Sequence, residues 1–177
     1  MSPSYRIVDY DAEWPKLFRK ERAAIAAAMG IGTRRIEHIG STSVPGLGAK
    51  PIVDMMVGVA KMPSVAEARR QFTSLRKLGY EFRGETVPGT LYVRKAGPPR
   101  FNLHMMRSRG AFWADHLLFR DYLRAHGDVA SRYEELKREL MSTMAHDATA
   151  YSGAKTEFIR SVLDRARAEA EMSQSAG

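Results

Sequence analysis

The feature that most constrains the fold is a turn of small residues between two apolar stretches. The segment from Ile36 to Asp54 reads IEHIGSTSVPGLGAKPIVD. The apolar stretches, at about 34–39 and 51–59, are typical of strands in a covered sheet. The turn at Gly40–Ala49 is predicted to open a short helix, and backbone N–H groups in such a turn point toward negative charge. This order of parts predicts a phosphate site with one carboxylate, Asp54, on the second strand.

Length and composition indicate one soluble globular domain. The chain has 177 residues, of which 44% are hydrophobic and 27% are charged, and one core is the default at this size. No apolar run approaches the roughly 20 residues of a membrane helix, and the N-terminus lacks the apolar region of a secretion signal. The absence of cysteine excludes disulfides and thiolate metal sites. We therefore expect a cytoplasmic protein with no membrane partner.

The charge of the chain favours anionic partners. Its formal net charge is +8 and its pI is about 9.9, values that attract anions without choosing among them. No acidic residue lies between Glu85 and Asp115, where five basic residues fall: Arg94, Lys95, Arg100, Arg107 and Arg109. This stretch is either an exposed basic hairpin or a set of side chains around a phosphorylated ligand. The second reading makes Arg94 a candidate phosphate contact.

Hydrophobic spacing predicts an α+β chain whose second half is helical. Apolar residues three or four positions apart are typical of amphipathic helices, whereas short apolar runs between turn residues favour strands. Besides the strands that flank the turn, we predict a helix from about 14 to 29, a helix from about 64 to 78, strands at about 80–83, 90–94 and 101–106, and helices from about 111 onward. A single domain then spans 1–171, with an α/β core to about 110, a helical part over about 111–171, and a tail at 172–177 that we expect to be disordered.

Motifs spread over the chain together resemble the GrpB family, a branch of the nucleotidyltransferase superfamily that is also found fused to dephospho-CoA kinases. The likeness rests on Tyr10-Asp11, Trp14-Pro15, Phe18, the stretch from Ile36 to Leu47, Lys50 to Asp54, Leu103-His104, Trp113, Phe119 to Arg124, and Lys155 to Ile159. The resemblance implies a nucleotidyltransferase-like mixed β-sheet flanked by helices.

The chemistry that this resemblance implies depends on carboxylates beside a Gly-Ser turn. In the superfamily, two acids at positions i and i+2 of a strand face the same way. They hold a pair of Mg²⁺ ions that clamp a nucleoside triphosphate for nucleotidyl transfer. Gly40 and Ser41 match the turn, and Asp54 matches the first acid. Met56 stands at the second position and cannot bind Mg²⁺, and His104 falls where a neighbouring strand often carries a third acid. These departures weaken the case for a two-metal mechanism.

The turn, the carboxylate and the nearby cations each receive a predicted role. Phosphate or nucleotide binding is assigned to Gly40, Ser41, Thr42, Ser43, Lys50, Arg94 and Arg120. A divalent metal is assigned to Asp54, His38 and His104; it is Mg²⁺ or Mn²⁺, with Zn²⁺ as a further choice because imidazole suits the softer ions. Asp54 and His104 are the predicted catalytic residues, and His104 acts either as a ligand or as a general base.

These roles have structural alternatives: the turn is a simple helix N-cap, Asp54 is buried in a salt bridge, and His104 is a core histidine with satisfied hydrogen bonds. Glu37 and His38 point to opposite faces of their strand, and we predict that His38 is the one turned toward the site. Lys50 either contacts a phosphate or is solvated. Arg120 or Arg124 either reaches a phosphate or belongs to an ion-paired helix that packs its aromatic residues into the core. Lys155, near the start of the last helix, is a further candidate for a phosphate contact.

The leading hypothesis is a protein of nucleotidyltransferase fold that binds a nucleotide or phosphorylated metabolite with a divalent metal and transfers a nucleotidyl group. The first alternative is a non-catalytic nucleotide- or phosphate-binding module with a degenerate metal site. The second alternative, nucleic-acid binding through the basic stretch 94–109, ranks last because no helix-turn-helix, RNP-like or zinc-finger pattern is present.

Overall fold

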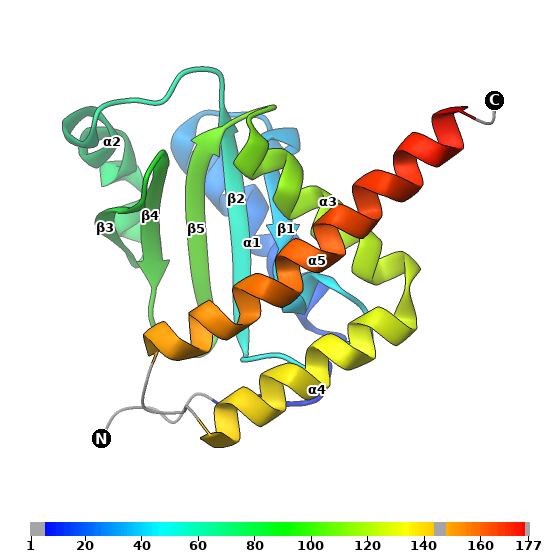
Figure 1. Ribbon diagram of the computed structural model, residues 1–177. Coiled ribbons are helices and arrows are strands. Elements are labelled where there is room, and N and C mark those ends of the chain that lie inside the picture. Colours follow the sequence, from blue (N-terminus) through cyan, green and yellow to red (C-terminus); the bar gives the residue numbers. More distant parts are fainter. Residues whose placement is uncertain (1–5, 144–147, 176–177) are drawn as a thin grey trace.

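The fold is built on one mixed sheet of five strands. The computed structural model describes residues 6–143 and 148–175. In the sheet the strands follow the order β1–β2–β5–β4–β3, as Figure 1 shows. Their bounds are β1 Ile36–Ile39, β2 Ile52–Val59, β3 Tyr80–Val87, β4 Thr90–Lys95 and β5 Arg100–Arg107. Only the β2–β5 pair is parallel within this sheet, and the other neighbours are antiparallel.

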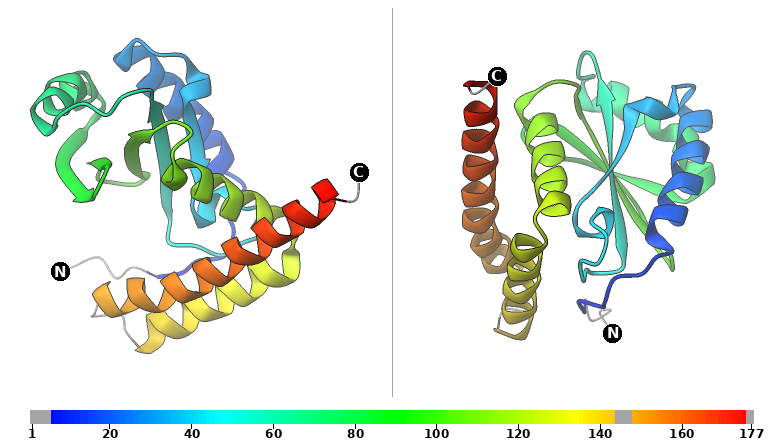
Figure 2. Two further views of the ribbon diagram at one scale, coloured as in Figure 1. Left: turned by 45° about the horizontal axis from the view of Figure 1, so that its top comes forward. Right: turned by 90° about the vertical axis from the view of Figure 1, so that its right-hand side faces the viewer.

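Helices cover the two faces of this sheet unequally. The long helices are α1 Trp14–Met29, α3 Ala111–Ala125, α4 Gly127–Thr143 and α5 Ala148–Ser175. The right-hand view of Figure 2 shows α1 on one side of the sheet and α3 and α5 on the other. Shorter pieces are α2 Val65–Gln71 and the single-turn or irregular 3₁₀ segments η1 Thr33–Arg35, η2 Ser41–Ser43 and η3 Phe72–Leu78. The helices α3, α4 and α5 pack against one another, and together they are called the helical layer below.

The strand β2, which lies between β1 and β5, is covered on both faces. Its residues alternate between the two faces, and Val53, Met55 and Val57 belong to one buried cluster with Trp14, Phe18 and Ile25 of α1. The opposite face of the same strand carries Asp54 and Met56 and lies under the helical layer. A strand covered on both faces reads as a nearly continuous apolar run, and Asp54 is the exception that needs a polar surrounding.

The predicted α+β class, with a mixed sheet and a helical second half, is confirmed. Three local predictions are wrong. The segment Gly40–Ala49 contains only the short turn η2, because Pro45 and two further glycines follow it and do not sustain a helix. The helix predicted over 64–78 divides into α2 and η3. The helix α5 continues to Ser175, so residues 172–175 of the expected disordered tail are helical, while 176–177 lie outside the described residues.

None of the helices over residues 6–143 and 148–175 has the length and apolar character required to span a membrane.

Candidate functional site

Asp54 stands near the start of β2, on the face that looks toward the helical layer. Its neighbours across the sheet are Ile39 on β1 and Asn102 on β5. Asn102 Nδ2 donates a hydrogen bond to Asp54 Oδ1 at 2.7 Å, and the hydroxyl of Tyr92 on β4 donates to Asn102 Oδ1 at 2.6 Å. The Tyr92 contact therefore orients the amide so that its NH₂ group faces the carboxylate. Asp54 has one oxygen held by the sheet.

The second oxygen of Asp54 lies against the turn. Gly40 has φ 70° and ψ −176°, a backbone conformation that side chains with a Cβ rarely adopt. A Cβ atom at Gly40 would meet Asp54 Oδ2 at 2.9 Å and Asp54 Cβ at 3.2 Å. Glycine is therefore required here for two reasons, the backbone angle and the close approach of the carboxylate.

The surroundings of Asp54 favour its protonated form more than water does. Burial raises the pKa of this carboxyl to about 6, against the hydrogen bond from Asn102 and the positive charges of Lys155, His116 and Lys50, which lower it. A carboxyl group with a pKa near 6 exchanges its proton close to neutral pH. Such a shift is typical of functional sites, although ion pairs in purely structural networks produce similar shifts.

The turn after β1 is held by its own side chains. Ser43 Oγ donates to the carbonyl of Gly40 at 2.6 Å, and the Ser43 backbone N–H donates to the same carbonyl at 3.1 Å. Thr42 is buried, and its hydroxyl makes a 3.0 Å hydrogen bond with His38 Nε2. Ser41 remains at the edge of the turn, with its hydroxyl toward the helical layer.

Three lysines surround the space between the turn and Asp54. This space, called the Asp54 pocket below, has a volume of about 180 Å³, and its polar lining consists of Ser41, Thr42, Lys50, Asp54, Asn102, Lys137 and Lys155. The lysines come from separate segments: Lys50 precedes β2, Lys137 lies on α4 and Lys155 lies on α5. Cations outnumber carboxylates in this lining by three to one.

Lys137 is the most buried of the three cations. Only 3% of the residue is exposed, and its Nζ donates to Ser41 Oγ at 3.0 Å and to the carbonyl of Gly48. Burial lowers its pKa to about 7. Burial also lowers the pKa of Lys155 and of Lys50, and each of these shifts is moderated by the charge of Asp54. An anion in the pocket would favour the charged form of all three amines.

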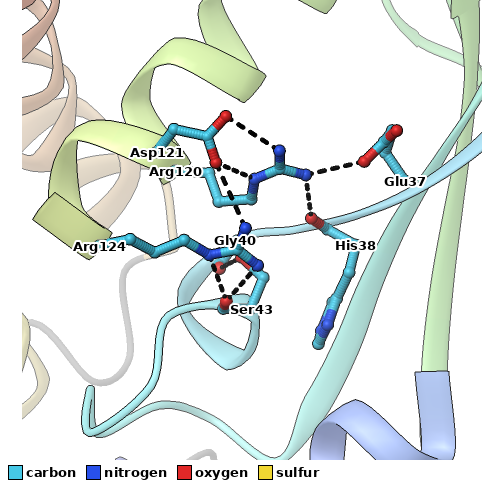
Figure 3. Close-up of polar contacts among 7 residues, drawn as sticks. All are labelled: Glu37, His38, Gly40, Ser43, Arg120, Asp121 and Arg124. Atoms are coloured by element: carbon cyan, nitrogen blue, oxygen red, sulfur yellow. Dashed lines mark hydrogen bonds and ion pairs between the residues drawn. The ribbon is translucent and has the colours of Figure 1, made fainter. Parts of the chain in front are cut away.

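The helical layer holds the turn through its arginines and one glutamate, as Figure 3 shows for α3. Arg124 donates from Nε and Nη2 to the carbonyl of Ser43 at 3.0 and 2.7 Å. Arg120 donates from Nη1 to Glu37 Oε2 at 2.9 Å and to the carbonyl of His38 at 3.1 Å. Its Nε and Nη2 bind Asp121, so the whole guanidinium is engaged by protein oxygens. On α4, Glu134 accepts a 2.6 Å hydrogen bond from the backbone N–H of Gly48.

The predicted phosphate residues thus fall into different places. Ser41, Thr42 and Lys50 line the Asp54 pocket, and Gly40 lies directly behind its carboxylate. Arg120 supports the turn from outside the pocket, in the manner of the ion-paired helix weighed as its alternative. Arg94 lines a neighbouring pocket of about 340 Å³ that shares Ile52 and Asn102 with the first.

The predicted orientation of His38 is wrong. The β1–β2 register pairs His38 with Met55, which belongs to the core face, and pairs Glu37 with Met56 on the Asp54 face. His38 is buried and stacks on Phe18 of α1 with a centroid distance of 4.7 Å. Burial is the main cause that lowers its pKa to about 3, and the charges of two arginines add to the effect. The aromatic contact with α1 decided which of the two residues turned inward.

His104 lies on β5, where it pairs with Met56 of β2, and its side chain is on the same face of the sheet as Asp54. Its ring stacks on Tyr92 with a centroid distance of 5.0 Å. Burial, with a contribution from His116, lowers its pKa to about 4, so the imidazole is neutral at pH 7 and able to accept a proton or a hydrogen bond.

The side chains do not form a metal centre by themselves. Within residues 6–143 and 148–175, no three His, Asp or Glu side chains are grouped so as to hold an ion. His38 faces the other side of the sheet from Asp54, and Asn102 turns its NH₂ group, not its oxygen, toward the carboxylate. The donor set does not fit a two-metal site. It fits a cation whose remaining ligands are phosphate oxygens and water, since Mg²⁺ commonly binds one carboxylate together with substrate phosphates.

Sequence reasoning missed two residues of this site. Asn102 stands two positions before His104, and the alternation of a strand places both on one face. Lys137 falls among the buried residues of α4, one turn after Tyr133 and one turn before Leu140. A lysine within a buried helical stripe is a signal that the sequence carries, because an unpaired buried ammonium is costly.

Comparison with known proteins places this architecture among related chains. A sequence model described as "GrpB protein" matches residues 4–165. The UPF0157 protein SCO7215 of Streptomyces coelicolor is 41% identical over 160 residues, which cover 90% of this chain and 83% of that protein. A crystal structure of the conserved protein GrpB from Enterococcus faecalis superposes with a TM-score of 0.77 at 30% identity, covering 91% of this chain and 96% of that one.

A more distant structure shares the fold. The Cid1 poly(U) polymerase, in a crystal structure with Mg and 3′-dATP bound, superposes with a TM-score of 0.50 at 11% identity over 73% of this chain and 41% of the polymerase. At this identity the likeness concerns the fold and not the reaction. The predicted nucleotidyltransferase-like fold is confirmed.

Proposed function

The chain belongs to the GrpB family, and from this membership and the lysines around Asp54 we propose that it binds the phosphate groups of a nucleotide or phosphorylated metabolite and transfers a nucleotidyl group. The observation that carries the proposal is the Asp54 pocket, in which Lys50, Lys137 and Lys155 face one carboxylate and the Ser41 hydroxyl. Three ammonium groups gathered in a partly buried space repel one another, and a phosphate chain relieves that repulsion.

The lysines can also replace the positive charge that a second metal ion would supply if position 56 carried an acid in place of Met56. In the superfamily pattern a second carboxylate binds metal, and the metal neutralises phosphate charge. Here the same neutralisation is available from Lys137 and Lys155. A divalent cation that arrives with the phosphates would have Asp54 as its protein carboxylate, and when bound it would supply further positive charge at the phosphates.

The acceptor in this proposal is a hydroxyl group. Its oxygen bonds to the α-phosphorus of the nucleotide, the bond from that phosphorus to the leaving pyrophosphate breaks, and the hydroxyl proton passes to a base. Because Asp54 is the carboxylate that would hold the cation, the base in this proposal is His104, whose imidazole is neutral and lies on the same face of the sheet.

One observation favours a second candidate, a binding module without catalysis. Met56, at the position of the second acid, is 0% exposed and packs with Ile39, Met106, Trp113 and Leu117. An apolar cluster of this kind leaves no room for a second metal ligand. This candidate predicts phosphate binding that survives EDTA and yields no product with any metal.

The nucleic-acid alternative has less support. Arg100 begins β5 beside the pockets, whereas Arg107 ends the same strand, paired with Val59 at the far end of β2. The basic stretch is therefore divided between two ends of the sheet, while nucleic-acid surfaces are typically continuous stripes of positive charge.

The test is a thermal-shift and calorimetric titration with pyrophosphate and the four ribonucleoside triphosphates, each with Mg²⁺, Mn²⁺ or EDTA. Lys155→Gln is expected to weaken pyrophosphate binding about tenfold, because a hydrogen bond between charged groups contributes roughly 1.5–3 kcal/mol. Lys77→Gln, an exposed lysine outside the pocket, is the matched control and should bind as the wild type does.

Asp54→Asn separates the two candidates. We expect it to abolish the metal-dependent part of nucleotide binding and all product formation while leaving the melting temperature within a few degrees of the wild type. Undiminished metal-dependent binding by this variant would sink the assignment of Asp54. Binding that is identical in Mg²⁺ and EDTA for the wild type, without product, would establish the non-catalytic module instead.

A further inference from the structure

A row of three polar side chains crosses the sheet at the level of Asp54. The register pairs Asp54 on β2 with Asn102 on β5, and Asn102 with Arg94 on β4. All three belong to the face under the helical layer, because paired residues in neighbouring strands point to the same side. Two strand spacings of about 4.8 Å each put the Asp54 and Arg94 backbones about 10 Å apart.

Arg94 belongs to a second hollow on this face, which we call the arginine pocket. It has a volume of about 340 Å³ and is lined by Tyr92, Arg94, Lys95, Arg100 and Asn102, with Ile52. Ile52 and Asn102 also line the Asp54 pocket, so the two hollows adjoin along these two residues. A volume of this size accommodates a small metabolite.

The cations of the arginine pocket differ in how they are engaged. Lys95 donates to Glu21 at 2.8 Å and is therefore neutralised by α1. Arg94 Nε is buried, and in the described part of the chain it has no hydrogen-bond partner. A buried guanidinium N–H without a partner is costly, and an anionic oxygen is the partner that its geometry suits best.

Asn102 connects the two pockets chemically. Its side-chain oxygen accepts a hydrogen bond from the Tyr92 hydroxyl, and its side-chain NH₂ group donates a hydrogen bond to Asp54. This fixed orientation separates the Asp54 carboxylate from the arginine pocket by one neutral group. A molecule that spans Asn102 could therefore place an anionic group at Arg94 and a hydroxyl at Asp54.

We propose that the arginine pocket is the acceptor subsite, and that the acceptor is a small alcohol bearing a carboxylate or phosphate group that binds Arg94. This inference rests on the proposed function, since it assigns the second substrate of the same transfer. In the reaction the acceptor oxygen bonds to the α-phosphorus, pyrophosphate leaves, and the proton of the hydroxyl passes to His104, which lies on the same face of the sheet. Asn102 acts as a positioning residue between the two substrates.

The experiment reads Arg94 directly by NMR. In ¹⁵N-labelled protein saturated with pyrophosphate and Mg²⁺, the Arg94 Nε–Hε signal is assigned by its absence in Arg94→Gln. Three matched three-carbon probes are then titrated: glycerol 3-phosphate, glycerate and, as a neutral control, glycerol. We expect the signal to move with the phosphate, the carboxylate or both, and not with glycerol, and the probe that moves it names the anionic group.

Two variants make the readout specific. By calorimetry, Arg94→Gln should bind the active probe at least about tenfold more weakly while its affinity for pyrophosphate stays within twofold. Arg83→Gln, an exposed arginine on β3, should change neither affinity. An Arg94 signal that moves with neither anion would overturn the acceptor subsite, and so would displacement of pyrophosphate by the probes.

The failure of the proposed function is distinguishable from these outcomes. Pyrophosphate that does not bind the wild-type protein would refute the phosphate site at Asp54, whatever happens at Arg94. The titration of the three probes without pyrophosphate then reports on the arginine pocket alone, and a silent Arg94 signal there would refute that pocket as well.

Discussion

At the scale of single residues, the site depends on the carboxylate of Asp54 and on its two neighbours, Asn102 and Gly40. Asp54 is held on one oxygen by Asn102 and approaches a glycine with the other. Its raised pKa follows chiefly from burial. The position of the carboxyl group is therefore set by two neighbours that carry no charge, and both neighbours can be tested by substitution.

Replacement of Gly40 should damage both the fold and the site. Gly40→Ala introduces a Cβ 2.9 Å from Asp54 Oδ2 at φ 70° and ψ −176°, and we expect it to lower the free energy of unfolding by about 3 kcal/mol. Gly30→Ala is the matched control, because Gly30 also has a positive φ but a Cβ added there would have no atom within 4 Å beyond its own residue and its chain neighbours. Urea unfolding should show a loss of only about 1 kcal/mol for the control. Equal losses in the two variants would contradict the close contact with Asp54.

Much of this residue-scale picture follows from the sequence, but not all of it. Gly40, Ser41 and Asp54 carry the local pattern of a turn and a carboxylate on one continuous segment, so local reasoning finds them. The predicted face of His38 is wrong, because alternation along a strand says that two neighbours differ without saying which one faces the core. The ring of Phe18 settles that choice, and a contact between α1 and β1 is not visible in the spacing of either segment.

At the scale of elements, the turn is a local structure held by distant helices. Arg124 on α3 binds the Ser43 carbonyl, and Lys137 on α4 binds Ser41 and Gly48. The residues joined by these bonds are 81, 96 and 89 positions apart. Helix periodicity predicts that α3 and α4 exist and which stripe they bury. It does not predict which loop that stripe covers, and this is why Lys137 escaped prediction.

Loss of the two hydrogen bonds from Arg124 to the Ser43 carbonyl should weaken phosphate binding, although Arg124 does not line the Asp54 pocket. Arg124→Lys keeps the charge but removes the paired donation from Nε and Nη2 to the Ser43 carbonyl. We expect pyrophosphate to bind about fivefold more weakly, equivalent to roughly 1 kcal/mol, and hydrogen exchange of the turn amides to become faster. Arg132→Lys, an exposed arginine on α4, serves as the control. Unchanged exchange rates in Arg124→Lys would mean that α3 does not hold the turn.

At the scale of the whole molecule, stability depends on pH through buried groups. The pKa of His38 falls from 6.5 in the unfolded chain to about 3 in the folded protein. A histidine that is neutral when folded contributes stability above pH 6.5, and this contribution is lost as the pH falls toward 3, because the unfolded chain takes up the proton first. Asp54 acts in the opposite direction, since its folded pKa is raised to about 6.

The contribution of His38 can be isolated by a paired measurement. Between pH 7 and pH 5, the free energy of unfolding of the wild type should decrease by about 2 kcal/mol relative to that of His38→Gln. The contribution of Asp54 is present in both proteins and cancels in the difference. Chemical unfolding at the two pH values provides the comparison. A difference that does not change with pH would show that His38 is not buried in its neutral form.

The arrangement of the three lysines has a consequence for synthesis of the protein. The residues that line the Asp54 pocket are spread along the chain from Ile7 to Lys155. The first and the last of them therefore leave the ribosome at very different times. At about 5–20 residues per second, the sheet can form seconds before α5 is available. When the sheet first forms, the turn and Asp54 face solvent without Lys137 of α4 and Lys155 of α5. Under the proposed function, a nascent chain stalled before Lys155 would therefore bind a phosphate ligand more weakly than a chain that carries all three lysines.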